Sequence, residues 1–335
     1  MSRRLDPRFR NRLRRAVGRR LGALVALLLA VILTGHLGGL WSPLDLASHF
    51  QVQYLVAAVV LLLIAAGLGL WRSALAAVLC VVLAAPRVAP WYLPIGGEGA
   101  PADGPALRVM LCNVLRANHE HRQLLVLVQQ QQPDVLVLLE VNDRWLAATA
   151  AVRDHLPHTI SDPREDDFGI AVFSRYPIER PQITTLGSAG VRSIVCELRL
   201  PEAEATLVAT HPLPPVSPRR TRLRDEQLRA VADRFAGIDG PAILVGDFNA
   251  SMWSAPYRAL AHQTDLVNAR RGHGVLPSWP AFLPEFMRIP IDHCLHSREI
   301  TVTGCAAGEP IGSDHLPLTI DLLLPPRSTA QRSAP

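Results

Sequence analysis

Acidic, amide and imidazole side chains stand where short apolar segments of this chain end. The clearest segment is 242–245, which is followed at once by Gly246, Asp247, Phe248 and Asn249. A short apolar run closed by Gly and Asp is typical of a buried strand that ends at a loop. Residues two apart along a strand point to the same side. Asp247 could therefore handle a proton while Asn249 holds an oxygen, although Asp and Asn also favour plain turns.

The same residue types recur at the ends of other predicted strands. In chain order they are Asn113, Glu140, His211, Asp247, Asn249, Asp292, Asp314 and His315. Carboxylate and amide oxygens suit Mg²⁺, which keeps several waters and takes one or two protein carboxylates. Imidazole can donate to a phosphoryl oxygen, and a neighbouring Asp can hold it in one tautomer. Each residue alone could be a turn, cap or loop residue, but their recurrence favours a site for a divalent ion and a phosphate.

The elements that would position these residues alternate between strands and helices from residue 106 to residue 324. Strands are predicted at 106–112, 134–139, 170–173, 193–198, 206–210, 242–245, 291–295 and 316–323, with a weak one at 301–303. Helices are predicted at 119–132, 218–236 and 255–262, the second opened by Ser217 as its cap and Pro218 in its first turn. This pattern predicts an α/β domain in which two sheets pack face to face with helices outside.

The order of the strand-end motifs resembles the endonuclease/exonuclease/phosphatase superfamily, which includes deoxyribonucleases, abasic-site endonucleases, inositol polyphosphate 5-phosphatases and neutral sphingomyelinases. The matching segments are Asn113-Val, Pro-Asp-Val-Leu-Val-Leu-Leu-Glu140, Thr-His211, Gly-Asp247-Phe-Asn249, Ile-Asp292-His and Gly-Ser-Asp314-His315. They span about Arg108 to Leu323. Trp253-Ser254, Trp279-Pro280 and Pro290 make the chain most similar to bacterial members with N-terminal membrane spans.

This resemblance implies a four-layer α/β sandwich that hydrolyses a phosphoester with Mg²⁺ or Mn²⁺. It makes Glu140 the principal metal ligand, supported by Asn113 and Asp314. One departure concerns this metal site. Abasic-site endonucleases have a carboxylate two positions after the first Asn, whereas this chain has Leu115 there. Asn118 is the residue that could compensate for the missing carboxylate.

The resemblance also implies the catalytic roles. Asp247 would activate or orient the water that attacks the metal-bound phosphate, and Asn249 would hold a phosphoryl oxygen. His211 would donate to the phosphate or help the leaving group. Asp292 would orient His315, whose imidazole would stabilise the developing negative charge. These roles agree with general physics, since fixed donors and a metal stabilise charge while one carboxylate prepares the nucleophile.

The expected substrate is a phosphoester of either a nucleic acid or a phospholipid or inositol-type headgroup. After residue 96 the chain has 23 Arg and 27 acidic residues, a net charge of −4. This negative charge disfavours binding of nucleic acid through many phosphate contacts. An Arg cluster on the helix from 218 could meet a phosphate, but a solvated face is the favoured interpretation; its members are Arg219, Arg220, Arg222 and Arg224. A non-catalytic membrane receptor or scaffold that keeps the fold is the alternative function.

Three apolar segments near the N-terminus predict membrane helices, at about 21–40, 54–71 and 73–91. A bilayer needs about 20 apolar residues, with a range of roughly 17–25. Buried core helices are the alternative, and a cleaved signal peptide would explain the first segment only. Residues 1–96 carry eleven Arg and two Asp, and nine of these Arg lie in the first twenty residues, so this tail is expected to stay in the cytoplasm.

With three spans, the domain at 106–324 would lie outside a bacterial inner membrane, in the periplasm; with two spans it would be cytoplasmic. A Gly/Pro linker is predicted at 94–105 and a disordered tail at 325–335. Four domain cysteines, Cys112, Cys196, Cys294 and Cys305, allow three full pairings between which the sequence does not choose. No protein partner is implied.

Overall fold

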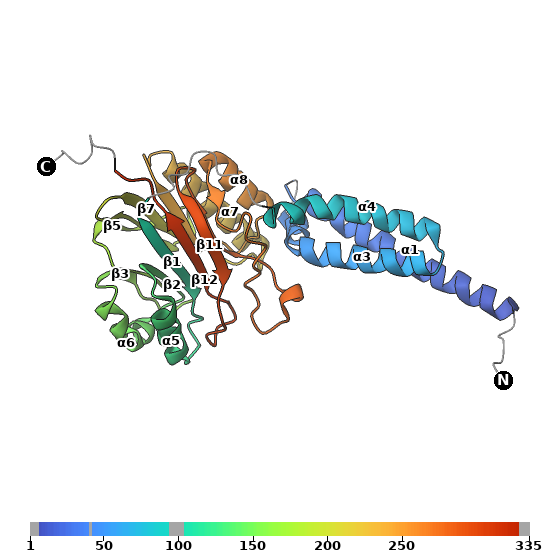
Figure 1. The fold of residues 1–335 in the computed structure, drawn as a ribbon, viewed down its shortest axis with the longest axis horizontal. Coiled ribbons are helices and arrows are strands. Elements are labelled where there is room, and N and C mark those ends of the chain that lie inside the picture. Colours follow the sequence, from blue (N-terminus) through green and yellow to red (C-terminus); the bar gives the residue numbers. More distant parts are fainter. Residues whose placement is uncertain (1–6, 40–41, 94–103, 328–335) are drawn as a thin grey trace. The chain divides into compact units, whose positions relative to one another are not determined.

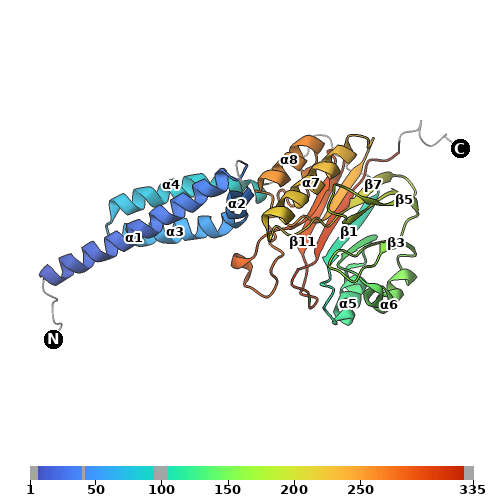
Figure 2. The same cartoon turned by 180° about the vertical axis from the view of Figure 1, so that it is seen from behind.

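The computed structural model describes residues 7–39, 42–93 and 104–327. The chain forms two compact units that divide between Pro90 and Trp91 (Figures 1 and 2). We call the first the helical unit and the second the α/β unit. Most of the predicted linker at 94–105 lies outside the described residues, as do the first six residues and residues 328–335 of the predicted tails.

The helical unit contains three segments that are long and apolar enough to cross a membrane: Arg12–His36, Leu46–Gly67 and Trp71–Trp91. Its elements are α1 (Pro7–His36), α2 (Ser42–Asp45), η1 (Leu46–Phe50), α3 (Gln51–Gly67) and α4 (Trp71–Val88), followed by η2 (Ala89–Trp91). The second segment was predicted to reach residue 71, but the helix ends at Gly67. Gly69 has a φ of 66° and turns the chain into α4.

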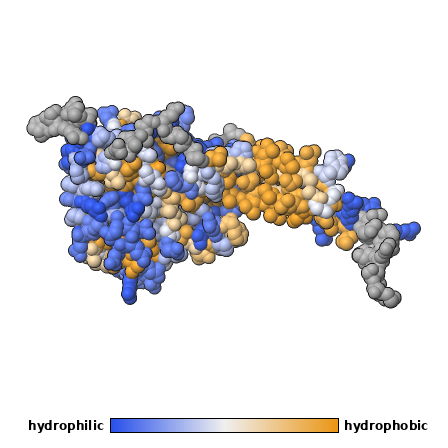
Figure 3. All heavy atoms as spheres, viewed as in Figure 1, coloured by the Kyte–Doolittle hydropathy of each residue, from blue (hydrophilic) through white to orange (hydrophobic). Residues whose placement is uncertain are grey.

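The surface of this unit is apolar along most of its length (Figure 3). Leu27, Leu63 and Leu75 are 63%, 67% and 64% exposed, although Leu is a residue that water-soluble folds bury. A helix that is apolar on its outer side as well as toward its neighbours is typical of a membrane span.

The α/β unit is built on two sheets of six strands each. The first has the order β11 (Thr301–Ala307), β12 (Leu318–Leu323), β1 (Ala106–Asn113), β2 (Val135–Leu139), β4 (Ile170–Ser174) and β3 (His158–Asp162). The second has the order β5 (Ile178–Thr185), β6 (Arg192–Arg199), β7 (Glu204–Ala209), β8 (Ala242–Asp247), β10 (Asp292–His296) and β9 (Val267–Asn268). Both sheets are mixed, with a parallel pair at the centre of each: β1 with β2, and β7 with β8.

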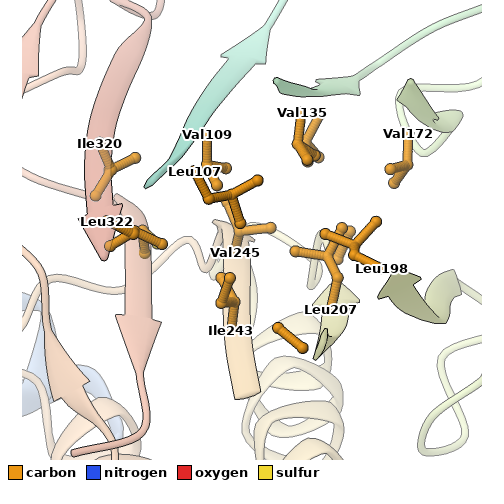
Figure 4. Packing of buried hydrophobic residues seen from close by; sticks show 14 of the residues in the cluster. Leu107, Val109, Val135, Val172, Leu198, Leu207, Ile243, Val245, Ile320 and Leu322 are labelled. Carbon is orange, nitrogen blue, oxygen red and sulfur yellow. The ribbon is translucent and has the colours of Figure 1, made fainter. Parts of the chain in front are cut away.

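The alternation of side chains along the central strands creates two apolar layers. Leu107, Val109 and Leu111 of β1 point into the layer between the sheets, where they meet residues such as Leu207 and Val245 of the second sheet (Figure 4). Met110 and Cys112 of the same strand point the other way, into a separate apolar layer. A strand buried on both faces needs apolar residues at consecutive positions, which explains the unbroken apolar runs.

Helices cover the outer faces and complete four layers, as predicted. The first sheet is covered by α5 (His121–Gln131) and α6 (Asp143–Ala148), whose Leu124, Leu127 and Trp145 pack in its outer apolar layer. The second sheet carries α7 (Pro218–Phe235) and α8 (Ala255–Thr264) (Figure 1). Two short 3₁₀ segments, η3 (Ala150–Asp154) and η4 (Glu285–Met287), lie in connections. The α/β class and sandwich architecture are therefore confirmed.

Candidate active site

The predicted site residues reach one another because of the direction in which the strands run. β1 is parallel to β2 and β7 is parallel to β8, so each pair ends at one edge of its sheet. Asn113 ends β1, Glu140 follows β2, His211 lies two residues after β7, and Asp247 ends β8. Asp292 begins the antiparallel strand β10 and is paired with Asp247 in the sheet register. Loops at such an edge are where α/β proteins place their ligand sites.

The last two predicted residues lie in the loop that leads into an antiparallel strand of the first sheet. Asp314 and His315 come shortly before β12, which runs antiparallel to β1 and therefore starts near the end of β1. The hydroxyl of Ser313 donates to the backbone carbonyl of Asn113 at 2.7 Å and accepts from the backbone N–H of His315 at 3.1 Å. Ser313 thus joins this loop to the end of β1.

Asp247 lies at the centre of the site and is fully buried. Its Oδ2 lies 3.4 Å from Nε2 of His211, 3.6 Å from Nε2 of His315 and 3.3 Å from Nδ2 of Asn113. Its Oδ1 accepts the backbone N–H of Asn249 at 2.8 Å. One carboxylate therefore contacts residues from both sheets.

His315 is held between two carboxylates. Its Nδ1 donates to Oδ2 of Asp292 at 2.8 Å, and the hydroxyl of Ser278 donates to the same oxygen at 2.6 Å. The other nitrogen, Nε2, faces Asp247. Asp292 is thus in hydrogen-bonding contact with His315, the residue that it was predicted to orient.

The charges of these groups explain the direction of their pKa shifts. Burial alone would lower the pKa of His315, but Asp292 and Asp247 raise it to about 10. Burial also opposes the charged form of His211, yet the hydrogen bond and charge of Asp247 raise its pKa. Burial would raise the pKa of Asp247, but the two imidazoles and the backbone N–H of Asn249 hold it below its usual range. Asp247 is therefore ionised and His315 protonated at neutral pH.

His211 has one nitrogen, Nε2, toward Asp247 and the other, Nδ1, turned away from it. Its buried Nδ1 has no hydrogen-bond partner among the described residues. The ring of Phe168 lies against the imidazole, with 5.4 Å between the ring centroids. An imidazole fixed in this way has a free position for a ligand atom.

Glu140 and Asn113 meet at the ends of β1 and β2. Nδ2 of Asn113 donates to Oε1 of Glu140 at 2.9 Å, and the backbone N–H of Arg116 donates to Oε2 at 3.3 Å. Glu140 has a φ of 62°, which non-glycine residues rarely adopt and which is enriched at functional sites. The amide oxygen of Asn113 accepts the N–H of Leu115, so Asn113 would offer an oxygen to an ion only after its amide turns.

Asp314 is anchored by a tryptophan from another loop. Nε1 of Trp279 donates to its Oδ2 at 3.0 Å, while Oδ1 is buried with no hydrogen-bond partner in the described part of the chain. No hydrogen bond or ion pair between described residues joins Asp314 to Glu140 or Asn113. The three predicted metal ligands thus form one contacting pair, Asn113 with Glu140, and a third residue that adjoins the site through His315.

Asn249 lies beside the site in a left-handed conformation, with a φ of 49°. Its Nδ2 donates to the backbone carbonyl of Pro212 at 2.9 Å, which leaves one amide hydrogen for a phosphoryl oxygen. Its own carbonyl accepts from NH1 of Arg224 at 2.7 Å. Arg224 was expected on a solvated helix face with its neighbours, but it is 1% exposed and supports the Asn249 loop. That expectation was wrong for Arg224, while Arg219, Arg220 and Arg222 are exposed.

Asn118 does not replace the carboxylate missing at Leu115. Its Nδ2 donates to the carbonyls of Val114 and Ile311, and its Oδ1 accepts the N–H of Glu120. Both ends of the amide are therefore used to hold the loop after β1. The five cysteines are free thiols, and those of the α/β unit are buried or half-buried.

Two groups of side chains in the site are candidates for holding a metal ion. Among the described residues, one set of three carboxylate and imidazole side chains has ligand atoms within 4.8 Å of one another: Asp247, Asp292 and His315. Both nitrogens of His315 face these carboxylates, and its raised pKa keeps it a donor, whereas a metal requires a deprotonated nitrogen. This set is better explained as a proton-bridged network.

Glu140 and Asp314 fit a hard divalent ion better. Burial raises the pKa of Glu140, so its charge is disfavoured where it stands, and a cation would remove that penalty. Oδ1 of Asp314 is buried and unpaired within the described ranges. Oxygen ligands of this kind suit Mg²⁺ or Mn²⁺. The residues present therefore fit the predicted ion.

Four side chains that support the site were not predicted to have functional roles. Ser278 contacts Asp292, Trp279 contacts Asp314, Phe168 packs on His211, and Arg224 supports the loop of Asn249. The buried position of one of these residues, Arg224, could have been inferred from the sequence. Arg224 falls at helical spacing with Leu228 and other buried residues of α7, which identifies the inward face. The other three depend on contacts between distant loops.

Comparisons with known proteins give one family and several similar structures. The sequence profile of the Endonuclease/Exonuclease/phosphatase family matches residues 109–315. None of the curated proteins matches the chain. An endonuclease/exonuclease/phosphatase structure from Beutenbergia cavernae DSM 12333 is 21% identical, with 65% of this chain and 72% of that chain covered and a TM-score of 0.52.

Two other solved structures have the same fold. TDP2 from D. rerio, complexed with a single-strand DNA product, is 15% identical over 65% of this chain and 98% of that chain, with a TM-score of 0.55. The human Nocturnin catalytic domain, with a bound sulfate anion, is 20% identical over 66% and 95% of the two chains, with a TM-score of 0.53. At these identities the similarity shows the fold alone.

Proposed function

Because the chain belongs to the endonuclease/exonuclease/phosphatase family, we propose that it is a membrane-anchored phosphoester hydrolase that depends on a divalent metal. Members of this family hydrolyse phosphoesters, and this membership supports the same reaction class for the chain. The assignment of roles to individual residues rests on one observation. His211, His315 and Asn113 all contact a single buried carboxylate oxygen of Asp247, at the edge where both sheets end.

In the proposed reaction, Asp247 orients the attacking water through Oδ2. Its lowered pKa keeps the carboxylate ionised, which makes it a constant hydrogen-bond acceptor although a weaker base. The water oxygen bonds to phosphorus as the bond from phosphorus to the leaving oxygen breaks. The water's proton passes toward Asp247, and the leaving oxygen takes a proton from an imidazole.

Two protonated or proton-sharing imidazoles would stabilise the charge that develops on the phosphate. His315, whose pKa is raised to about 10, keeps its positive charge while Asp292 fixes its orientation. His211 presents its unpaired Nδ1 to a phosphoryl or leaving oxygen. Asn249 has one amide hydrogen left for the same phosphate. Fixed donors aimed at developing charge commonly supply the largest part of catalysis.

Glu140 and Asp314 would hold the divalent ion, with Asn113 in support. When bound, Mg²⁺ or Mn²⁺ supplies Lewis-acid stabilisation of the phosphoryl oxygens. Trp279 would fix the orientation of Asp314, since hydrogen bonds to ligand side chains set their direction.

The apolar helices support anchoring in a membrane. Three segments are long enough to span, and the Arg-rich start of α1 favours a cytoplasmic N-terminus at a bacterial inner membrane. Three spans would then put the α/β unit in the periplasm. A C-terminal alkaline phosphatase fusion tests this placement, because that reporter is active only outside the cytoplasm.

The deciding experiment assays the full chain in nanodiscs against a panel of phosphodiesters and phosphomonoesters, with Mg²⁺, with Mn²⁺ and with a chelator. We expect metal-dependent hydrolysis that Asp247→Asn reduces by about 10²-fold or more. Glu140→Gln should weaken Mn²⁺ binding measured by electron paramagnetic resonance. Asp265→Asn is the matched control, because this carboxylate forms an exposed ion pair with Arg298. No hydrolysis across the panel would support the non-catalytic receptor or scaffold instead.

A further inference from the structure

A loop beside the candidate site exposes three large apolar side chains. Phe282 is 78% exposed, Phe286 is 62% exposed and Met287 is 46% exposed, all within residues 280–288. We call this segment the apolar loop. It includes η4 and projects from the body of the α/β unit, where it is drawn in orange (Figure 1). Two exposed Phe and one Met so close together mark an interaction surface rather than scattered surface residues.

The apolar loop is held in shape, so this exposure is a property of the fold. Nε of Arg288 donates to the carbonyl of Leu283 at 2.7 Å, and its NH2 donates to the carbonyl of Ala281 at 2.9 Å. Pro280 and Pro284 each fix one backbone angle. Polar groups thus brace the base of the loop while its aromatic side chains point into solvent.

The same loop is joined directly to the site. Trp279, directly before the loop, donates to the carboxylate of Asp314, and the N–H of Ala281 within the loop donates to the backbone carbonyl of Asp314 at 2.7 Å. The ring of Trp279 lies 6.5 Å from that of His315, measured between centroids. Whatever binds the apolar loop therefore lies close to the phosphate-handling residues.

A second loop that adjoins the site has the same character. It leads from His211 to α7, and its Pro212 carbonyl accepts from Asn249. It exposes Val216, which is 74% accessible. Exposed Arg219, Arg220 and Arg222 follow at the start of α7. Apolar residues next to Arg are the pattern of a surface that enters lipid while its cations meet phosphate headgroups.

We propose that the apolar loop inserts into the bilayer that holds the chain's own spans, so that the substrate is a lipid-linked phosphoester at the membrane surface. This rests on the proposed function and adds the substrate class to it. Fourteen residues separate Trp91 from Ala106, a reach of at most about 50 Å when extended. The start of the α/β unit therefore stays within about 50 Å of the third span, on whichever side of the membrane the unit lies.

The first test compares two substrates for the full chain in proteoliposomes. One is a fluorogenic phosphodiester carried on a lipid in phosphatidylcholine and phosphatidylglycerol vesicles, and the other is water-soluble bis(4-nitrophenyl) phosphate. The variant replaces Phe282, Phe286 and Met287 with Ser. We expect kcat/KM to fall at least tenfold on the lipid substrate and to stay within twofold on the soluble one. Ile183→Ser is the control, since Ile183 is 37% exposed on β5, the edge strand on the other side of the second sheet from β9 and β10, which flank the apolar loop in the sequence.

The outcomes separate this inference from the proposed function. Equal losses on both substrates, or no loss on either, would overturn membrane docking while leaving hydrolysis intact. Failure of the wild type to cleave any phosphoester would contradict the proposed function, and docking is then decided by a measurement that needs no activity.

That second measurement uses a bimane label at Phe282→Cys in nanodiscs that contain lipids brominated along the acyl chain. We expect the bromines to quench the label at least twofold more than a label at Ile183→Cys. Equal quenching at the two positions would overturn the proposal, and it would favour a protein partner for the apolar loop.

Discussion

Gly246 provides a direct test of how the strands position the site, because an added methyl group would have no space. A Cβ at this position would lie 1.8 Å from the backbone carbonyl oxygen of Thr210, at the point where β7 passes β8. Cβ contacts below 3.0 Å essentially never occur, so the two strand ends must separate by about 1.2 Å, the difference of these distances. The nearest atoms all belong to the backbone of Thr210 and not to a flexible side chain, so the backbone itself must move.

This movement would act on catalysis through the residues next to the contact. Thr210 precedes His211 and Gly246 precedes Asp247, so Gly246→Ala shifts the two partners whose atoms now lie 3.4 Å apart. A misplacement of about 1 Å costs roughly 10²-fold in rate. Overpacking should also lower the free energy of unfolding by about 1–3 kcal/mol.

The measurement is kcat/KM for the full chain on the best substrate of the panel, together with thermal unfolding in the same detergent. Gly237→Ala is the matched control, since its Cβ would meet nothing closer than 4.0 Å. We expect Gly237→Ala to behave like the wild type in both assays. If Gly246→Ala kept activity within threefold and an unchanged melting temperature, the contact between β7 and β8 would not be what positions His211 and Asp247.

Four further predictions concern residues around this centre. Asp292→Asn removes the largest of the influences that raise the pKa of His315 to about 10, so the alkaline limb of the pH profile of kcat/KM should move down by two or more pH units; an unchanged limb would contradict this. In the wild type the raised pKa of His315 also stabilises the fold fully below about pH 6.5, and this contribution should be lost as the pH rises through about 10. Trp279→Phe keeps the ring but removes the N–H that holds Asp314, so Mn²⁺ affinity measured by electron paramagnetic resonance should fall about 10–100-fold; an unaltered affinity would show that the indole does not orient a ligand. Arg224→Met should lower the free energy of unfolding by about 2 kcal/mol in denaturant titrations, because hydrogen bonds from a buried charged group are lost, while Arg222→Met on the exposed face should change it little.

The central strands could be predicted from the sequence because they are buried on both faces. Residues 135–139 are all Val or Leu, and a run of this length favours a buried strand over a helix, which needs about ten residues or more. The edge strands could not be predicted in the same way. β5 contains Pro181 and mostly polar, exposed side chains, and β3 has no fully buried residue. Such segments become strands because a neighbouring strand supplies hydrogen bonds, a condition that local composition does not reveal.

The candidate site, too, could be predicted only in part from the sequence. The types and order of the residues at strand ends could be found from the sequence, since parallel central strands bring their ends to one edge. Contacts between loops could not. Ser278 reaches Asp292 across fourteen positions, and Trp279 reaches Asp314 across thirty-five. Asn118 shows the opposite error, because a residue of suitable type near the motif is used entirely in holding its own loop.

The balance of charge at the site supports the proposed need for a divalent ion. The site brings together four carboxylates, those of Glu140, Asp247, Asp292 and Asp314, and two imidazoles. Even with both imidazoles protonated its net charge is −2, from four negative and two positive charges. A phosphodiester adds one more negative charge, and in a buried site that repulsion is weakly screened. Burial raises the pKa of Glu140, so the site as it stands disfavours the charged form of this carboxylate. A divalent cation would bring the complex with substrate to −1 and let Glu140 ionise, so metal and substrate should bind with positive coupling. Titrating Mn²⁺ with and without a non-hydrolysable phosphodiester analogue measures that coupling, and equal affinities would show that the imidazoles alone offset the phosphate.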